Sequence, residues 1–195
     1  HKKERTAFEE ILDAAIVKGL LPGNCAKQIM DSTYVLGAGA VQDTYTLIRT
    51  AIRKILKTIS KQLELVALLP KPLNLDYQSR TKPKINWEDP AERNKLLNEL
   101  CQDALQIVEI VDKLKLSPKE QELRDILATV AIQDIEQQKD GTVKMKQGVA
   151  KDRIISASDP EMRHGRKSSA RKFDGYKTHT AIETDNNFIT EIEVT

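Results

Sequence analysis

The strongest constraint on the fold is an alternating pattern of side chains near the end of the sequence. Residues 173–183 alternate, with Tyr176 and Ile182 on one side and Lys177 on the other, which is typical of a β-strand. Residues 188–194 alternate again, and the intervening Asp185-Asn186-Asn187 tolerates the positive φ of a tight turn. The pattern predicts a β-hairpin, and residues 27–36 are available as a third strand.

The candidate third strand carries a single carboxylate, Asp31, followed by Ser32 and Thr33. A carboxylate buried in an otherwise apolar strand is costly unless it is paired, hydrogen-bonded or bound to a metal. One interpretation is a strand-end Asp that caps the following turn with the two hydroxyl residues. The other is a metal ligand. The strand alone leaves both open.

Between these strand signals the sequence is helical. A capping box formed by Thr6 and Glu9 predicts a helix that ends at Gly19. Apolar residues at helical spacing predict a second helix over residues 41–68. Start signals at Asp89 and Ser117 predict two more helices, to about residues 114 and 135, packed as an antiparallel pair. The predicted fold class is therefore α+β.

Other polar residues of this helical region have simpler interpretations. Asp103, Glu109 and Asp112 are assigned to the solvated face of the helix pair rather than to a catalytic site. Residues 70–86 are expected to form a loop, and residues 137–150, which are polar and contain two glycines, a linker.

The composition of the 195 residues bounds the class of protein. An aromatic content of only 4% and a hydrophobic content of 39% suit a helix-rich protein with an aliphatic core. No apolar run reaches the length of a membrane span. Cys25 and Cys101 lie far apart without metal-type spacing, so both are expected to be free thiols in a reducing cytoplasm.

Two regions concentrate positive charge although the formal net charge is only +2. The predicted helix over residues 41–68 carries a basic ridge, which is either a solvated face or a nucleic-acid contact. Residues 139–177 hold eleven Lys or Arg residues against five acids, a net charge of +6. Such a region is either a natural surface for phosphate backbones or a solvated basic loop. The ridge residues are Arg49, Arg53, Lys54, Lys57 and Lys61.

Two passages of the sequence resemble a known family. The first is Met30-Asp31-Ser32-Thr33-Tyr34 and its continuation to Tyr45. The second runs from Asp152 through Asp159-Pro160-Glu161-Met162-Arg163-His164-Gly165-Arg166-Lys167 to Phe173-Asp174-Gly175-Tyr176-Lys177-Thr178-His179. Together they resemble the DDE transposases of bacterial insertion sequences, in the IS1182-like branch of the IS4 and IS5 types.

The resemblance implies an RNase H-like core with a partial antiparallel sheet of three strands and a helical insertion between the first and second. The corresponding domains are residues 1–40 (helix and first strand), 41–137 (helical insertion), 138–172 (basic linker or loop with a short strand) and 173–195 (hairpin). The implied chemistry is DNA strand cleavage and transfer by two Mg²⁺ (or Mn²⁺) ions held by carboxylates. Asp31 is the implied catalytic residue and metal ligand.

The resemblance also implies DNA as partner, both the terminal repeats of the insertion sequence and the target DNA. A homodimer and a cytoplasmic, nucleoid-associated location in bacteria are further expectations, with no membrane association. In this context the basic run supplies seven candidate DNA-binding residues: Arg163, His164, Arg166, Lys167, Arg171, Lys172 and Lys177.

The sequence departs from the family because the second Asp and the Glu of the triad are missing. It also starts at His1 inside a helical pattern and stops at Thr195 inside a strand pattern, so we expect a fragment of a longer protein. The parent protein is then an enzyme, and this chain alone is expected not to cut DNA. The alternative is a non-enzymatic DNA-binding or interaction protein derived from a transposase.

Overall fold

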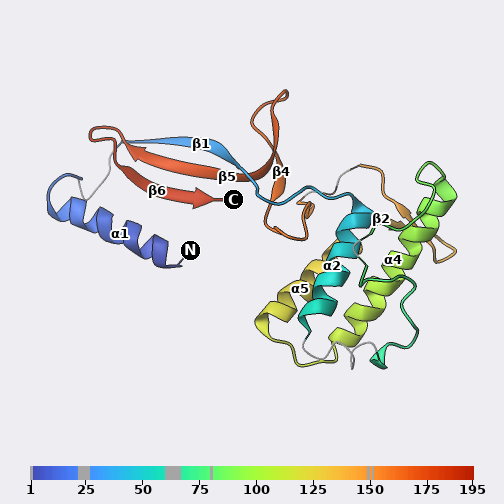
Figure 1. Cartoon of the computed structure of the whole chain (residues 1–195). Helices are drawn as coiled ribbons and strands as arrows, with labels where there is room; N and C mark the ends of the chain where they lie inside the picture. The colour runs from blue at the N-terminus through green and yellow to red at the C-terminus, as the bar shows by residue number, and fades with distance from the viewer. Residues whose placement is uncertain (1, 22–26, 60–66, 80, 149, 151) are drawn as a thin grey trace. The chain divides into compact units, whose positions relative to one another are not determined.

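The computed structural model has an α+β fold with antiparallel sheets, as the sequence predicts (Figure 1). The structure describes residues 2–21, 27–59, 67–79, 81–148, 150 and 152–195. Cys25 and Lys61 lie outside these residues. The chain forms two compact units: unit 1 contains residues 1–36 and 165–195, and unit 2 contains residues 37–164.

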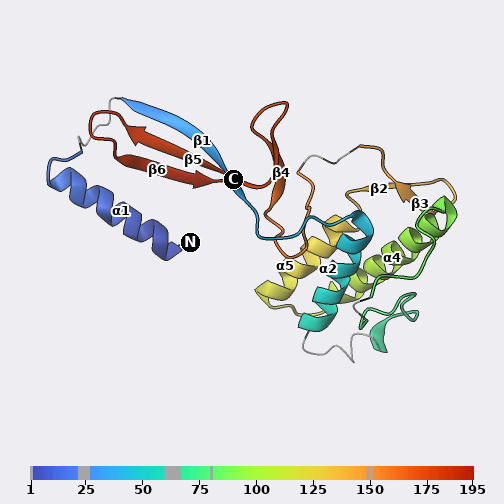
Figure 2. The same cartoon turned by 45° about the horizontal axis from the view of Figure 1, so that its top comes forward.

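Unit 1 is built on a sheet in which the longest strand, β5 (Lys172–Glu183), is central. β1 (Gln28–Leu36) pairs antiparallel with one side of β5, with Asp31 opposite Thr180. β6 (Ile189–Val194) pairs antiparallel with β5 through a bulge at Ala181/Ile182, and both pairings are visible in Figure 2. The short β4 (Arg163–Arg166) also pairs with β5, so the sheet has one strand more than the three predicted.

The turn between β5 and β6 follows the prediction from its residues. Asn187 adopts a φ of 58°, a conformation that Asn tolerates better than most residues. The Glu183 carboxylate accepts hydrogen bonds from the amides of Asp185 and Asn186, both at 2.8 Å, which closes the turn. These bonds lower the pKa of Glu183, because they favour its charged form.

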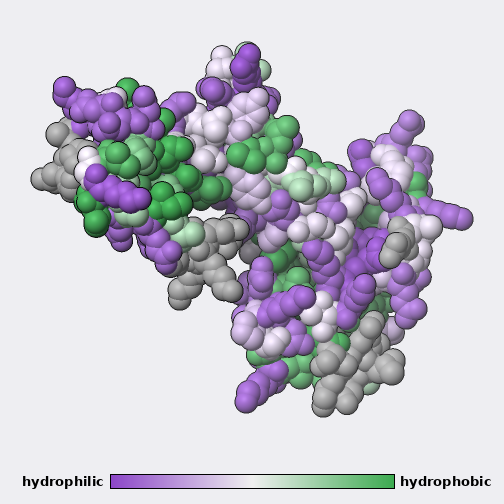
Figure 3. Space-filling view, turned by 60° about the vertical axis from the view of Figure 1, so that its left-hand side comes forward, coloured by the Kyte–Doolittle hydropathy of each residue, from purple (hydrophilic) through white to green (hydrophobic). Residues whose placement is uncertain are grey.

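Unit 1 leaves much of its apolar surface open. Every residue of β1 is exposed, including Met30 at 75% and Leu36 at 68%. The helix α1 (Lys2–Val17) belongs to the same unit but leaves Ile11 and Val17 exposed as well. Figure 3 shows hydrophobic surface accordingly exposed on this unit. The hydrophobic effect therefore stabilises unit 1 much less than a covered sheet.

Unit 2 holds the main hydrophobic core. Helices α2 (Thr44–Thr58), α4 (Pro90–Val111) and α5 (Pro118–Val130) contribute apolar faces at the predicted spacing. The side chains of Asp89 and Ser117 cap α4 and α5, and Glu120 completes a capping box, as predicted. Cys101 is a buried free thiol in this core, and burial raises its pKa to about 12.

Several element boundaries differ from the prediction. Helix α1 begins at Lys2, so Thr6 lies inside it rather than at its N-cap. Helix α2 ends at Thr58, and residues 60–66 of the predicted helix lie outside the described residues. Helix α5 ends at Val130, earlier than predicted. The expected linker contains a small hairpin formed by β2 (Ile135–Gln137) and β3 (Val143–Met145). Its turn closes because Asp140 accepts from Thr142 and Gly141 takes a φ of 82°.

The assignment of Asp103 to a solvated face is wrong. Its side chain is 0% exposed and accepts hydrogen bonds from Asn74, the amide of Leu75 and the hydroxyl of Tyr77. Glu109 and Asp112 are exposed, as expected. A second buried carboxylate, Asp134, pairs with Arg153 at 2.7 Å and accepts from Thr44. Both carboxylates tie loops to the helices of unit 2.

Candidate functional site

Asp31 lies in the middle of β1, and its side chain is exposed. Its Oδ1 accepts a hydrogen bond of 2.8 Å from the amide of Ser32. The strand continues to Leu36, so no turn follows Asp31 that its side chain caps as the simpler interpretation required. The metal-ligand interpretation was motivated by the cost of burying a carboxylate. Because Asp31 is exposed, its carboxylate does not incur this cost.

A hollow of about 420 Å³ lies along β1 in unit 1, and we call it the β1 hollow. The residues that line it come from β1, from the end of β4, from the β4–β5 connection and from β5. They are Met30, Asp31, Ser32, Thr33, Tyr34, Arg166, Lys167, Phe173, Lys177 and His179. Three of them are cationic, and Asp31 is the one carboxylate among the described lining residues.

The wall of the β1 hollow is fixed by an aromatic stack. The rings of Tyr34 and Phe173 stack with centroids 5.1 Å apart and an interplanar angle of 22°. Phe173 is buried, and its ring lies directly against Gly165 of β4, where an added Cβ would overlap it. The small residue between His164 and Arg166 is therefore needed for the stack to form.

The register of the strands separates the polar residues of the hollow between two faces. Directly opposite residues of an antiparallel pair share a face, so Ser32 lies with His179 and Tyr34 with Lys177. Asp31 pairs with Thr180 and points to the opposite face, at the free edge of β1. The structure thus places Asp31 beside the basic residues along the strand but does not aim its side chain at them.

His179 connects two hydroxyl groups across the sheet. Its Nδ1 lies 2.7 Å from the Ser32 hydroxyl and its Nε2 lies 3.2 Å from the Thr195 hydroxyl. A histidine held at both ring nitrogens has a fixed orientation, with one nitrogen accepting and the other donating in the neutral form. Sequence reasoning missed this arrangement, because the alternation shows that Lys177 and His179 share a face but not which β1 residues lie opposite them.

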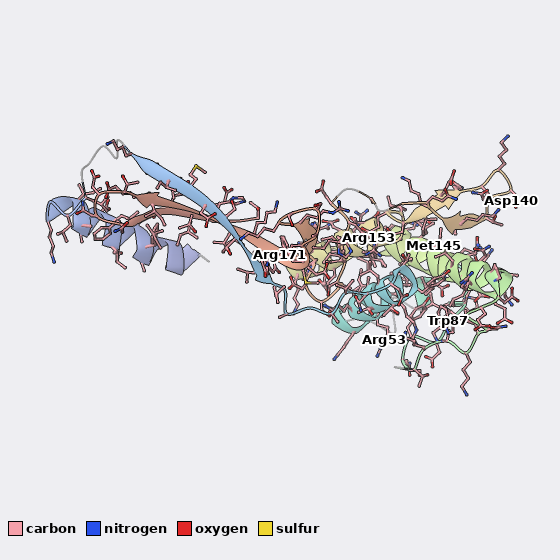
Figure 4. The ribbon with its side chains drawn as sticks, turned by 90° about the horizontal axis from the view of Figure 1, so that it is seen from above. Arg53, Trp87, Asp140, Met145, Arg153 and Arg171 are labelled. Atoms are coloured by element: carbon pink, nitrogen blue, oxygen red, sulfur yellow. The ribbon has the colours of Figure 1, made fainter. Side chains whose placement is uncertain are left out.

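The seven predicted DNA-binding residues fall into two groups. Arg166, Lys167, Arg171, Lys172 and Lys177 are exposed in unit 1, on the β4–β5 hairpin and on β5. Lys167 and Arg171 are joined through their backbone, which makes the basic segment the tight end of a hairpin rather than an open loop. Figure 4 labels Arg171 near this end.

Arg163 and His164 belong to the end of unit 2. The guanidinium of Arg163 donates to the carbonyls of Pro160 and Met162, so it serves to hold its own backbone. His164 is exposed.

The described residues do not form a two-metal centre by themselves. Among them, no group of three or more His, Cys, Asp or Glu side chains lies close enough together to hold a metal ion. Two Mg²⁺ ions need several oxygen ligands, and the β1 hollow offers one carboxylate among cations that repel a metal. The β1 hollow as the structure describes it therefore does not fit a two-metal centre by itself.

Comparisons of the chain with protein-family models, with curated proteins and with solved structures found no match. None of the helices in the described part of the chain is long and apolar enough to span a membrane.

Proposed function

We propose that this chain is part of the catalytic core of a bacterial DNA transposase and that its β1 hollow binds the DNA backbone. The observation that carries the proposal is the clustering of Arg166, Lys167 and Lys177 along the strand that holds Asp31. The three basic residues follow Asp31 by more than 130 positions in the sequence, and the pairing of β1 with β5 brings them beside the strand that holds it.

The order of the strands supports the proposal. The transposase resemblance implies a first strand with an Asp, then a helical insertion, then two strands that complete an antiparallel meander. Here β1 carries Asp31, unit 2 follows, and β5 and β6 add to β1 in that order. The RNase H-like assignment of this sheet belongs to the proposal.

Asp31 has a limited role within this chain. In the proposed transposase Asp31 would supply one acidic ligand, and the remaining carboxylates would have to come from outside the described residues. We therefore expect the isolated chain to bind DNA without cutting it. In the proposed transposase, the exposed position of Asp31 on β1 would leave it accessible to a segment that brings further ligands.

The basic residues account for the binding by counter-ion release. Five exposed cations lie on the hairpin and β5 of unit 1, and if each neutralises one phosphate the slope of log K against log salt is about −4 to −5. Ser32 and His179 add hydrogen-bonding groups on the face of Lys177. These contacts carry no base specificity, so they are expected to position DNA of any sequence.

The test is the affinity for a fluorescent DNA duplex measured by anisotropy over a range of salt concentrations. The double variant Lys167→Gln/Lys177→Gln removes two cations from the β1 hollow, so the slope should become shallower by about 2. The matched control Lys115→Gln/Lys119→Gln removes the same charge from exposed positions of unit 2. Equal losses in both double variants would show that net charge, and not the hollow, determines the affinity.

A second candidate function is a DNA-binding protein without catalytic activity. The exposed cations along the β1 hollow suit it as well as they suit the transposase. Both candidates predict the same DNA affinity, and Asp31 distinguishes them. Only the transposase requires this carboxylate for a reaction, whereas a binding protein tolerates Asp31→Asn without loss of function.

A further inference from the structure

Unit 2 contains a cationic cavity that the β1 hollow does not involve, and we call it the Arg49 cavity. Its volume is about 160 Å³, and it lies between α2, the start of α4 and the loop that precedes α4. An adjoining hollow of about 460 Å³ shares Thr50 and Arg53 with it and adds Lys54 and Lys57. Neither lining includes an acidic side chain among the described residues. The polar and aromatic lining of the Arg49 cavity comprises Tyr45, Thr46, Arg49, Thr50, Arg53, Lys82 and Trp87.

Two arginines one helical turn apart are held in this cavity by backbone carbonyls. Arg49 Nη2 donates to the carbonyls of Asp76 and Ser79, at 3.0 and 2.8 Å. Arg53 Nε donates to the carbonyl of Tyr77 at 2.9 Å. Carbonyls orient a guanidinium without neutralising it, so the two positive charges remain available to an anion.

Arg49 has an unused donor. Its Nε is buried and has no hydrogen-bond acceptor among the described residues, although both bonds of Nη2 are made. A buried donor without an acceptor is unfavourable and rare in folded proteins. Burial and the neighbouring Arg53 also lower the pKa of Arg49, and Tyr77 and Asp76 offset this effect only in part. An anion in the cavity offsets the positive charge of the two neighbouring guanidinium groups.

Two aromatic residues, Tyr45 and the partly exposed Trp87, form an apolar part of the cavity wall. Tyr45 and Trp87 meet edge to face, with ring centroids 5.4 Å apart. Arg53 and Trp87 lie along the same edge of unit 2 (Figure 4). Apolar walls reduce the local dielectric constant and strengthen the attraction between the guanidinium groups and an anion. Lys82 is exposed at this cavity and adds a third cation.

We propose that the Arg49 cavity is a phosphate-binding site in which Arg49, Arg53 and Lys82 hold the oxyanion. Arginine donors match the tetrahedral oxygens of a phosphate through paired hydrogen bonds, and Lys82 adds a point charge. The phosphate belongs either to a DNA backbone or to a free phosphate ion, since both present the same oxygens. This site is independent of the proposed function, because it lies in unit 2 and uses none of the residues of the β1 hollow.

Trp87 makes the proposal measurable, because it is the only tryptophan of the chain and lies in the cavity wall. Its fluorescence is followed during titration of the whole chain with sodium phosphate and, separately, with a short DNA duplex, at constant ionic strength balanced with chloride. We expect a saturable change with at least one probe. Saturation with phosphate alone identifies a free-anion site, and saturation with DNA only identifies a backbone phosphate.

Variants separate the site from general charge effects. Arg53→Gln should raise the apparent Kd about tenfold or more, since it removes a charged donor. Lys82→Gln should raise it several-fold without disturbing the fold, because this side chain is exposed. The matched control is Lys84→Gln, which removes the same charge only two residues further along the chain. Lys84 does not line the cavity, so this variant should bind like the unmodified chain.

Two results would overturn the proposal: no saturable change with either probe, or equal weakening by Lys82→Gln and Lys84→Gln. Lys167→Gln and Asp31→Asn, both in unit 1, should leave this titration unchanged. A failure here therefore leaves the DNA-binding proposal for the β1 hollow untouched, and the reverse also holds.

Discussion

Replacing Asp103 with Ala should destabilise unit 2 more than any exposed substitution on the same helix. The carboxylate is fully buried on α4 and accepts from the Asn74 and Leu75 amides, the Asn74 side chain and the Tyr77 hydroxyl. It thereby fixes the loop over residues 74–77 against the helix. In Asp103→Ala these donors lose their acceptor, and the Tyr77 hydroxyl stays buried without one.

The magnitude follows from this set of bonds. Hydrogen bonds to a charged group contribute about 1.5–3 kcal/mol each, but they are not additive when they share one acceptor. We expect a loss of about 3–5 kcal/mol in the free energy of unfolding. With a urea m-value of about 2 kcal/mol/M, the midpoint should fall by about 2 M.

The assay is urea denaturation followed by the fluorescence of Trp87, which lies in unit 2. The control is Glu109→Ala, which removes an exposed carboxylate from the same helix and should change the stability by about 0.5 kcal/mol or less. A second readout is the pKa of Tyr77, which burial and the hydrogen bond to Asp103 raise. In Asp103→Asn this pKa should fall. A loss below about 1 kcal/mol in Asp103→Ala would show that the carboxylate does not hold the loop over residues 74–77 against the helix.

Three further predictions concern unit 1. Amides of β1 should exchange with solvent at least about tenfold faster than those of α4, because the core lies in unit 2; equal protection in hydrogen-exchange measurements would contradict this. Gly165→Ala should displace the Phe173 ring and break its stack with Tyr34, which NMR ring-current shifts of Tyr34 would report; unchanged shifts would oppose it. The pKa of Glu183 is lowered in the folded state, so its ionised form stabilises the fold. This stabilisation is fully present above the ordinary pKa of 4.5 and is lost as the pH falls through the lowered pKa. The amide signals of Asp185 and Asn186 should therefore shift as the pH falls through this lowered pKa, and Glu183→Gln should abolish that titration. Persistence of the titration in the variant would assign it to another group.

Local signals predicted much of the fold. The caps at Asp89 and Ser117, the apolar stripes of α2, α4 and α5, and the turn at Asn187 depend on residues close in sequence, and each was predicted from them. The β2–β3 hairpin was missed because its strands have three residues each, too few to show alternation.

The long-range contacts could not be predicted from the sequence. Asp103 is buried by a loop that lies nearly 30 residues earlier in the sequence. The residues next to Asp103 would look the same if it lay on a solvated helix face, so the local sequence does not reveal the burial. The β1 hollow depends on the register of β1 against β5, which sets Ser32 opposite His179 and leaves Asp31 on the other face. A shift of one residue would exchange these faces, and the sequence of β1 contains no signal that fixes the register.

The transposase proposal is tested by measuring whether supercoiled plasmid DNA is nicked in Mg²⁺ or Mn²⁺. The protein used is the product of the complete reading frame that encodes this chain. Asp31→Asn keeps the shape of the side chain and removes its charge, and the 195-residue chain serves as the comparison. If the chain belongs to a transposase, the complete product cuts, Asp31→Asn reduces cutting at least about 100-fold, and both proteins bind DNA equally well. Cutting that persists in Asp31→Asn, or binding without cutting in the unmodified complete product, would contradict it.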